Sequence, residues 1–449
     1  MTADNTFSIT KSDRYDIVIA GGGMVGVSLA CALAKVDVDK KLSILLVDNF
    51  PVQRLGSNDA SQGPTYHPSF DARSTALSQA SIDIYESLGV LPELLKHASP
   101  IRQVHVSERG HAGSTLLDAS EQQGSRRPKG QVESFGYVIE NQWLGAVLLD
   151  HLMALPTVEF LTSARVCNIT PKQAGVSVDV VDEGVDEGVG ESVANTTTVD
   201  ASLLIIADGA KSSLRDSLGI TSSVTHYDQR AVIANVQTQL PHNGQAFERF
   251  VDDGAVAFLP LIDLPDSKNR SALIWTMPKC KDGDKDKAQV DDQAFIAAVQ
   301  QAFGYRLGEI QRIGKRQSYP LALSVADEVV RNHIVIMGNA AHSLHPVAAQ
   351  GFNLSLRDVA VLVERISEAM QNDEDISALA LLERYAESQL KDQDLTIGFS
   401  HHLIKLFGQQ AFPVQAGRSL GLLALDLLRP AKKQFSDRAS GIAGRRSLQ

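Results

Sequence analysis

The sequence predicts an α/β protein with a parallel, ligand-binding sheet, a strand-rich layer inserted between parts of that domain, and a helical C-terminal region. Three features indicate this fold. An apolar strand at 15–20 enters a glycine-rich turn and a helix, further apolar strands end at polar residues, and alternating apolar runs fill 227–276. Apolar strands interspersed with helices are typical of parallel sheets.

The first strand and turn predict a dinucleotide-binding motif. YDIVIA at 15–20 precedes a glycine turn and an Ala/Leu-rich helix, and the turn fits the spacing GxGxxG. In this motif the first glycine makes the tight turn, the second admits a pyrophosphate, and the third lets helix and strand pack closely. The residues expected at the cofactor are Gly21, Gly23, Met24, Val25 and Gly26.

Polar residues follow three more predicted strands. Asp48 ends the strand at 43–47, Asp208 and Gly209 follow 203–207, and Asn339 follows 334–337. Ligands of open α/β sheets gather at the carboxyl ends of strands, so these residues should line one crevice with the glycine turn. A carboxylate at Asp48 can also accept hydrogen bonds from both ribose hydroxyls of an adenosine.

The stretch 334–358 predicts an anion site. A loop carrying Pro346 follows the strand, and a helix begins near Phe352, just after Gly351. Free N–H groups and the helix dipole favour an anion at such a helix start, and a reduced flavin is one. A purely structural loop is the alternative.

Two other positions have an ordinary and a functional interpretation. The segment 70–88 predicts a helix whose first turn carries Arg73, either a surface arginine near an N-terminal acid or one that reaches the cofactor. A strand-to-helix segment at 136–149 places Asn141 at the helix start, where capping is the ordinary role and cofactor contact the other.

Composition excludes several classes of function. The formal net charge of -11 argues against a nucleic-acid partner. The three cysteines lie far apart without CxxC, which fits a reducing cytosol, and no metal-ligand spacing is present. The polar N-terminus does not read as a signal peptide, and no apolar run is long enough to span a bilayer, so we expect a cytoplasmic protein.

Taken together, these motifs resemble the three cofactor motifs of class A FAD-dependent aromatic monooxygenases. The glycine turn with Asp48, Asp208-Gly209 with Arg215, and GNAAH at 338–342 with QGFN at 350–353 carry the likeness. VHVSERGHAG (105–114), AFERF (246–250) and GKRQSYPLAL (314–323) are similar to the ubiquinone-biosynthesis hydroxylases, in particular their 2-octaprenyl-6-methoxyphenol hydroxylase branch. Asn339 and Ala349 depart from the aspartate and glycine usual in the family.

The resemblance implies a Rossmann-like FAD-binding domain of the glutathione-reductase/p-hydroxybenzoate-hydroxylase type, an inserted β-sheet substrate domain and a helical C-terminus. It divides the chain into FAD-binding parts at 13–98, 136–222 and 329–365, substrate parts at 99–135 and 223–328, and a helical region at 366–449.

The implied reaction is hydroxylation of 2-polyprenyl-6-methoxyphenol to the 1,4-benzoquinol. NAD(P)H would reduce FAD, and O2 would form a flavin C4a-hydroperoxide whose distal oxygen attacks the ring. The ribityl chain and flavin ring would contact Asn339, Gly351, Phe352 and Asn353. His345, next to Pro346, or Tyr319 would assist phenol deprotonation. The layer at 231–275 would form the floor of an apolar pocket for the prenyl chain.

Alternatives remain open: a sister hydroxylase acting at another ring carbon, a flavin oxidoreductase on another aromatic substrate, and a non-catalytic binding protein.

The C-terminal helices carry an apolar face at 403–407 and 420–428, followed by Arg429, Lys432 and Lys433. This face either packs against the flavin domain or touches a membrane or another ubiquinone-biosynthesis protein, as at the inner membrane.

Overall fold

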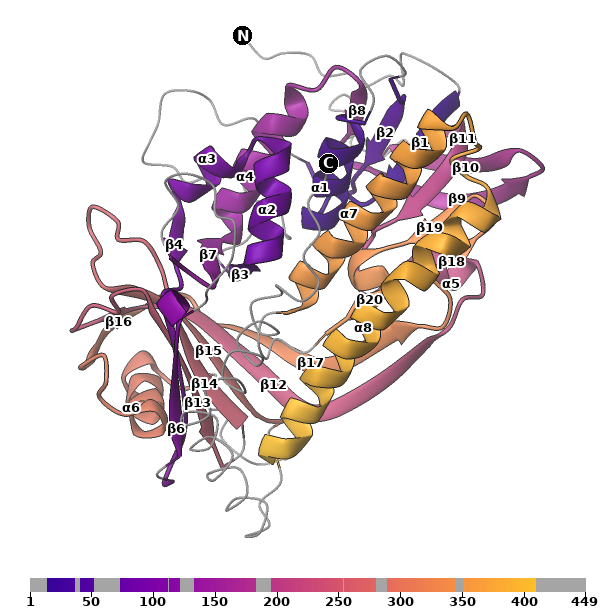
Figure 1. Cartoon of the computed structure of the whole chain (residues 1–449). Helices are drawn as coiled ribbons and strands as arrows, with labels where there is room; N and C mark the ends of the chain where they lie inside the picture. The colour runs from indigo at the N-terminus through magenta and orange to yellow at the C-terminus, as the bar shows by residue number, and fades with distance from the viewer. Residues whose placement is uncertain are drawn as a thin grey trace, which may run out of the picture.

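The structure is a computed structural model. It describes residues 14–36, 41–51, 73–111, 113–121, 133–182, 195–252, 254–279, 289–344 and 350–408, with side chains up to His402. The predicted α/β fold with an inserted sheet is confirmed (Figure 1).

The first sheet contains the predicted parallel strands in the order β19-β11-β1-β2-β8. Near the carboxyl ends of the central strands, at 17–20, 44–47 and 203–206, every residue is apolar and buried, as expected for a parallel sheet covered on both faces. β18, β10 and β9 add antiparallel neighbours. The bounds are β1 (Arg14–Ala20), β2 (Ile44–Val47), β8 (Val158–Leu161), β9 (Ala164–Lys172), β10 (Gly175–Asp182), β11 (Asn195–Ile206), β18 (Val330–Arg331) and β19 (Ile334–Ile336).

Helices cover one face of this sheet. Ile17, Ile19 and Leu46 share one buried cluster with apolar residues of the helices, whereas Val18 and Leu45 belong to a second cluster on the other face. The helices of the first cluster are α1 (Met24–Leu33), α2 (Gln79–Leu88), α3 (Leu91–Leu95), α4 (Asn141–Met153), α7 (Gln350–Gln371) and α8 (Leu379–Gly408).

The second sheet is the predicted strand-rich layer, with strand order β20-β17-β12-β15-β14-β13-β5-β6 and β16 beside β12. One face packs on α6 (Asp292–Phe303) through an apolar cluster that includes Phe258, Leu273 and Phe295. The bounds are β5 (Gln103–Glu108), β6 (Ser114–Asp118), β12 (Ser222–Thr238), β13 (Gln245–Val251), β14 (Gly254–Pro260), β15 (Arg270–Pro278), β16 (Ile310–Ile313), β17 (Gln317–Ala326) and β20 (His342–Ser343).

A small sheet lies between the two layers and corrects one prediction. Its strands are β3 (Ser74–Ser78), β7 (Gly136–Glu140) and β4 (Ala98–Pro100). The predicted helix over 70–88 is therefore wrong at 74–78, where β3 pairs antiparallel with β7. The helix starts only after Ser78, whose hydroxyl accepts a hydrogen bond from the Ser81 N–H and caps α2.

The C-terminal helix α8 lies along α7 (Figure 1) and ends the described chain at Gly408. Among the described residues no helix is both long and apolar enough to cross a bilayer.

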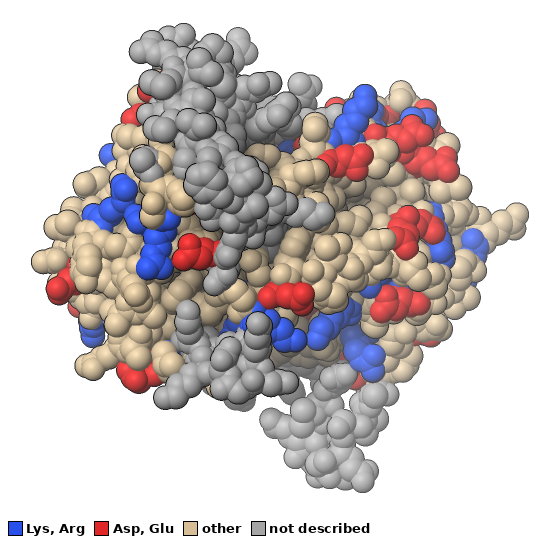
Figure 2. Space-filling view, turned by 90° about the horizontal axis from the view of Figure 1, so that it is seen from below, with Lys and Arg blue, Asp and Glu red and all other residues tan. Residues whose placement is uncertain are grey.

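Figure 2 shows that acidic and basic side chains are interspersed on the face seen from below, most of which is uncharged. The basic residues at 429–433 lie outside the described residues, and the side chains at 403–407 are not described. The six-segment domain division stays a prediction.

Candidate functional site

The glycine turn after β1 has the close contacts that its motif requires. Gly21 has φ +113°, and a Cβ there would lie 2.4 Å from the carbonyl oxygen of Ala207. A Cβ on Gly26 would lie 1.9 Å from the carbonyl oxygen of Gly21. Any larger residue at either position would push the turn away from the sheet, so the glycines set the position of the backbone that precedes α1.

The start of α1 is suited to an anion. Gly23 is the N-cap residue and offers no side-chain hydrogen bond, and the first turn carries no acidic residue. The free N–H groups of Met24 and its neighbours can therefore bind a phosphate, as predicted by the motif. Val25 lies against Gly338, where an added Cβ would approach its side chain to 3.2 Å, so the first and third motifs are in contact.

Asp48 is buried and fixed by two backbone donors. Its Oδ2 accepts a hydrogen bond from the Gly22 N–H at 2.5 Å, and its Oδ1 accepts one from the Phe50 N–H at 2.8 Å. Each carboxylate oxygen can accept more than one hydrogen bond, so this arrangement is compatible with a ribose hydroxyl on either oxygen.

The structure brings the four predicted strand ends together. Ala20 pairs with both Val47 and Ile206, and Ile206 pairs with Ile336, so the strands end level with one another. Asp208 and Asn339, which follow β11 and β19, are exposed at this edge. Gly209 has φ +98°, a conformation that favours glycine.

Arg215 ties the second motif to the third. It lies on α5 (Ser213–Ser217) and is only 5% exposed. Its Nη1 donates to the carbonyl oxygen of Ala340 at 3.0 Å, in the short helix η2 (Gly338–Ala340). The buried guanidinium therefore holds the loop after β19, which has Asn339 at its centre.

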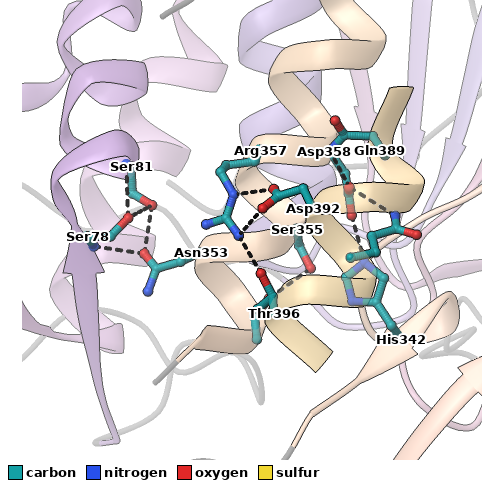
Figure 3. Close-up of polar contacts among 12 residues, drawn as sticks. Ser78, Ser81, His342, Asn353, Ser355, Arg357, Asp358, Gln389, Asp392 and Thr396 are labelled. Atoms are coloured by element: carbon teal, nitrogen blue, oxygen red, sulfur yellow. Dashed lines mark hydrogen bonds and ion pairs between the residues drawn. The ribbon is translucent and has the colours of Figure 1, made fainter. Parts of the chain in front are cut away.

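The third motif lies at the described start of α7, Gln350, close to the helix start predicted near Phe352. Gly351 and Phe352 are partly exposed, and the side chain of Asn353, whose polar contacts Figure 3 shows, is buried. Asn353 Oδ1 accepts hydrogen bonds from the Ser78 N–H at 2.8 Å and the Ser81 hydroxyl at 2.6 Å, and Nδ2 donates to the Ala76 carbonyl oxygen at 2.8 Å. This side chain thus anchors α7 to β3 and α2.

A buried network that the sequence analysis did not single out supports the same loop (Figure 3). His342 Nε2 lies 2.6 Å from Asp358 Oδ2, and both side chains are about as buried as the core. Asp358 Oδ1 also accepts hydrogen bonds from Gln389 at 2.7 Å and Gln393 at 3.1 Å. The network links the loop after β19 to α7 and α8, elements whose contact is not evident from sequence spacing.

Arg73 and Tyr319 meet between the two layers. The Arg73 guanidinium carbon lies 5.1 Å from the centre of the Tyr319 ring, and the Tyr319 hydroxyl donates to Gln317 Oε1 at 2.6 Å. Arg73 precedes β3 rather than starting a helix, so the interpretation as a residue of a helical first turn is wrong. The cation stacks on the tyrosine ring and faces the second sheet.

Of the two roles considered for Asn141, capping is wrong, and the cofactor contact stays a prediction. Glu140 is the N-cap residue of α4, and no side chain caps that helix. Asn141 Oδ1 instead accepts a hydrogen bond from the Thr75 hydroxyl at 2.6 Å, and its N–H donates to the Arg73 carbonyl oxygen at 2.7 Å. Asn141 thereby fixes the backbone at Arg73.

Three predicted residues, His345, Pro346 and Ala349, lie outside the described residues. Within the described ranges no cluster of His, Cys, Asp and Glu could hold a metal ion. His401 Nδ1 lies 2.9 Å from the Tyr227 hydroxyl, which joins α8 to β12.

Comparisons with known proteins relate most of the chain to one family. A family model described as "FAD binding domain" matches residues 14–391. The ubiquinone hydroxylase UbiL of Rhodospirillum rubrum is 32% identical over 95% of this chain and 89% of its own length. The mitochondrial ubiquinone biosynthesis monooxygenase COQ6 of Homo sapiens is 26% identical over 95% of this chain and 92% of its own.

Among solved structures, p-nitrophenol 4-monooxygenase PnpA from Pseudomonas putida DLL-E4 superimposes with a TM-score of 0.71. It is 17% identical, and the match covers 97% of this chain and all of that one. At this identity the likeness supports the fold alone. The overall fold is therefore shared with that solved monooxygenase structure.

Proposed function

Since the chain belongs to the FAD-dependent monooxygenases of the ubiquinone-hydroxylase family, we propose that it hydroxylates a polyprenylated methoxyphenol. The substrate would be 2-polyprenyl-6-methoxyphenol and the product the corresponding 1,4-benzoquinol. NAD(P)H would supply the electrons and O2 the transferred oxygen atom. The observation that carries the proposal is the level alignment of the ends of β1, β2, β11 and β19, in a chain whose second sheet has an apolar face turned to the small sheet.

The chain's own residues fit FAD. The glycine turn and the uncapped start of α1 would hold the pyrophosphate, and Asp48 would accept the adenosine ribose hydroxyls. Asp208 and Gly209 would lie along the pyrophosphate, and the Asn339 amide could hydrogen-bond the ribityl chain without adding a charge. When bound and reduced, FAD supplies the chemistry that activates O2 for transfer to an electron-rich ring.

The backbone at Gly351 to Asn353 would face the flavin ring. The first turn of α7 contains no acidic residue, and its N–H groups would stabilise negative charge on the reduced ring. Because the Asn353 side chain is already engaged with Ser78, Ser81 and Ala76, its contribution would come from the backbone. Arg73, which stacks on Tyr319, would reach the ring from the substrate side.

The substrate would lie on the second sheet, on the face turned away from α6. Apolar residues of this face include Ala246, Ala272 and Leu259, which form a cluster with Ala76 and Val138 of the small sheet. Such a surface suits a prenyl chain and excludes water from the reacting ring. Tyr319 borders it, and His345 with Pro346 remains the other proposed group near the phenol.

We also place the protein in the cytoplasm, in peripheral contact with the inner membrane where a prenylphenol resides. Other ubiquinone-biosynthesis proteins are the proposed partners. The support is the predicted apolar and basic C-terminal segment at 420–433.

The proposed substrate is tested by quinone-intermediate profiling. Cells that lack this protein are extracted, and their prenylated intermediates are measured by mass spectrometry. Accumulation of 2-polyprenyl-6-methoxyphenol, reversed by the wild-type gene, is the expected result. Accumulation of a later methylated quinol would assign the chain to a sister hydroxylase that acts at another ring carbon.

A further inference from the structure

Glu248 lies on the substrate-facing side of the second sheet. In the strand register Glu248 pairs with Ala257, Ala257 with Ile274, and Ile274 with Ile233. Residues directly opposite each other across paired strands share one face of a sheet. The row ends at Gln317, which pairs with Ile233 and accepts a hydrogen bond from the Tyr319 hydroxyl. Tyr319 lies two residues further along the same strand, so Glu248 shares a face of the sheet with Tyr319, on whose ring Arg73 stacks.

This face is open along the row that contains Glu248. Glu248, Ala257, Ile274 and Ile233 are all partly exposed, although they lie on neighbouring strands within the sheet. Side chains of the opposite face, such as Phe258, Leu273 and Val232, are at most 1% exposed beneath α6. Within the described ranges, the sheet therefore has one fully covered face and one largely apolar face whose side chains along this row are partly exposed.

Glu248 carries an ionisable group on this apolar face without a counter-charge. Desolvation by the surrounding protein raises the pKa of its carboxyl to about 7, and no described hydrogen-bond donor or cation opposes this. Among the described residues, the other ionisable groups that the strand register puts on this face are Glu108, Arg270, Arg312, Tyr319 and His342. Across the interface lie Arg73 and Glu140, and Glu140 is paired with Arg270.

An isolated carboxyl in apolar surroundings destabilises a fold, and such groups concentrate at sites where a ligand or reaction uses them. The sequence analysis quoted AFERF at 246–250 only as part of a resemblance and gave Glu248 no role. Its face depends on strand register, which the sequence does not fix.

We propose that Glu248 binds the phenol hydroxyl of the substrate and accepts its proton during hydroxylation. The inference rests on the proposed function and deepens it. The phenol O–H bond breaks, a new O–H bond forms on the Glu248 carboxylate, and the electron pair stays on the phenol oxygen, where it enriches the ring. The neighbouring alanines and isoleucines would contact the methoxy and prenyl groups.

The test compares a short-chain 2-prenyl-6-methoxyphenol with its O-methyl ether, each titrated into the FAD-loaded enzyme and followed by flavin fluorescence. The wild type should prefer the phenol by roughly 10- to 100-fold at pH 8, the range expected for a hydrogen bond to a charged group. The preference should shrink at pH 5, where Glu248 is protonated. Glu248→Gln should bind both ligands about equally at both pH values.

Glu309→Gln, an exposed acid next to β16 in the same layer, is the matched control and should keep the wild-type preference. A Glu248→Gln variant with wild-type preference would overturn the assignment. A wild-type preference that is unchanged between pH 5 and pH 8 would overturn it equally, without needing the variant. Product formation by the wild type, measured separately, shows whether the proposed function itself has failed.

Discussion

Glu140 and Arg270 join the small sheet to the second sheet through a buried bidentate ion pair. Arg270 Nη2 and Nη1 donate to the two carboxylate oxygens of Glu140 at 2.9 and 3.2 Å, and the side chains are 9% and 3% exposed. Asn235 donates to the same carboxylate at 2.8 Å. Glu140 ends β7 and directly precedes α4, so the pair fixes the second sheet against the small sheet and the start of α4.

Replacing Arg270 by methionine should lower the free energy of unfolding by about 3–5 kcal/mol, because it leaves the Glu140 charge buried and unpaired. Urea denaturation followed by circular dichroism measures the change. Lys268→Ala is the control, since Lys268 and Asp263 form an exposed pair at 4.0 Å that should contribute at most about 1 kcal/mol. Equal effects of the two substitutions would refute the role assigned to Arg270.

Gly26→Ala should abolish FAD binding, because the new Cβ would lie 1.9 Å from the Gly21 carbonyl oxygen and displace the turn. The flavin absorbance of purified protein, per mole of chain, measures the loss. Gly398→Ala is the matched control, since nothing lies within 4 Å of its added Cβ on α8. The free energy of unfolding should rise by about 1 kcal/mol, because alanine favours a helix more than glycine does, and the flavin content should not change. Full flavin content in Gly26→Ala would contradict the assignment of the turn.

Asp48→Asn should weaken FAD binding by roughly 10- to 100-fold, because one of two charged acceptor oxygens becomes an NH2 group. That group would also face a backbone N–H now held by the carboxylate. Titration of the apoprotein with FAD gives the affinity. Asp150→Asn, on an exposed position of α4, should leave it unchanged. Unaltered affinity in Asp48→Asn would remove Asp48 from the site.

The raised pKa of Glu248 predicts a pH-dependent stability. Its value moves from an ordinary 4.5 to about 7 on folding, so the folded protein holds more protons between these values. The stability contributed by the protonated group is thus present below pH 4.5 and is lost as pH rises through 7. The free energy of unfolding of Glu248→Gln, relative to that of the wild type, should therefore rise by roughly 3 kcal/mol from pH 4.5 to pH 8 in urea titrations. A difference independent of pH would contradict this.

Patterns within single strands predicted the parallel strands of the first sheet well. The apolar runs before Gly21, Asp48, Asp208 and Asn339 are continuous because both faces of a parallel sheet are covered, and such runs are visible in the sequence. The alternating runs at 227–276 predicted the second sheet for a similar reason, since each face has its own environment.

Contacts between distant segments could not be predicted in this way. Ser74 to Ser78 continue into α2 without a break in the sequence pattern, and only their pairing with β7 makes them a strand. Asn141 accepts a hydrogen bond from Thr75 and does not cap α4. Asn353 accepts hydrogen bonds from Ser78 and Ser81, which lie more than 270 positions earlier. The face occupied by Glu248 likewise depends on four strand pairings.

The most direct test of the central claim is an oxygen-labelling experiment. The FAD-loaded protein is given NAD(P)H and 2-polyprenyl-6-methoxyphenol under heavy-isotope O2, and the product is analysed by mass spectrometry. The account predicts a 1,4-benzoquinol that carries one labelled oxygen. A protein that takes up no FAD, or that leaves the phenol unlabelled while it oxidises NAD(P)H, would contradict it.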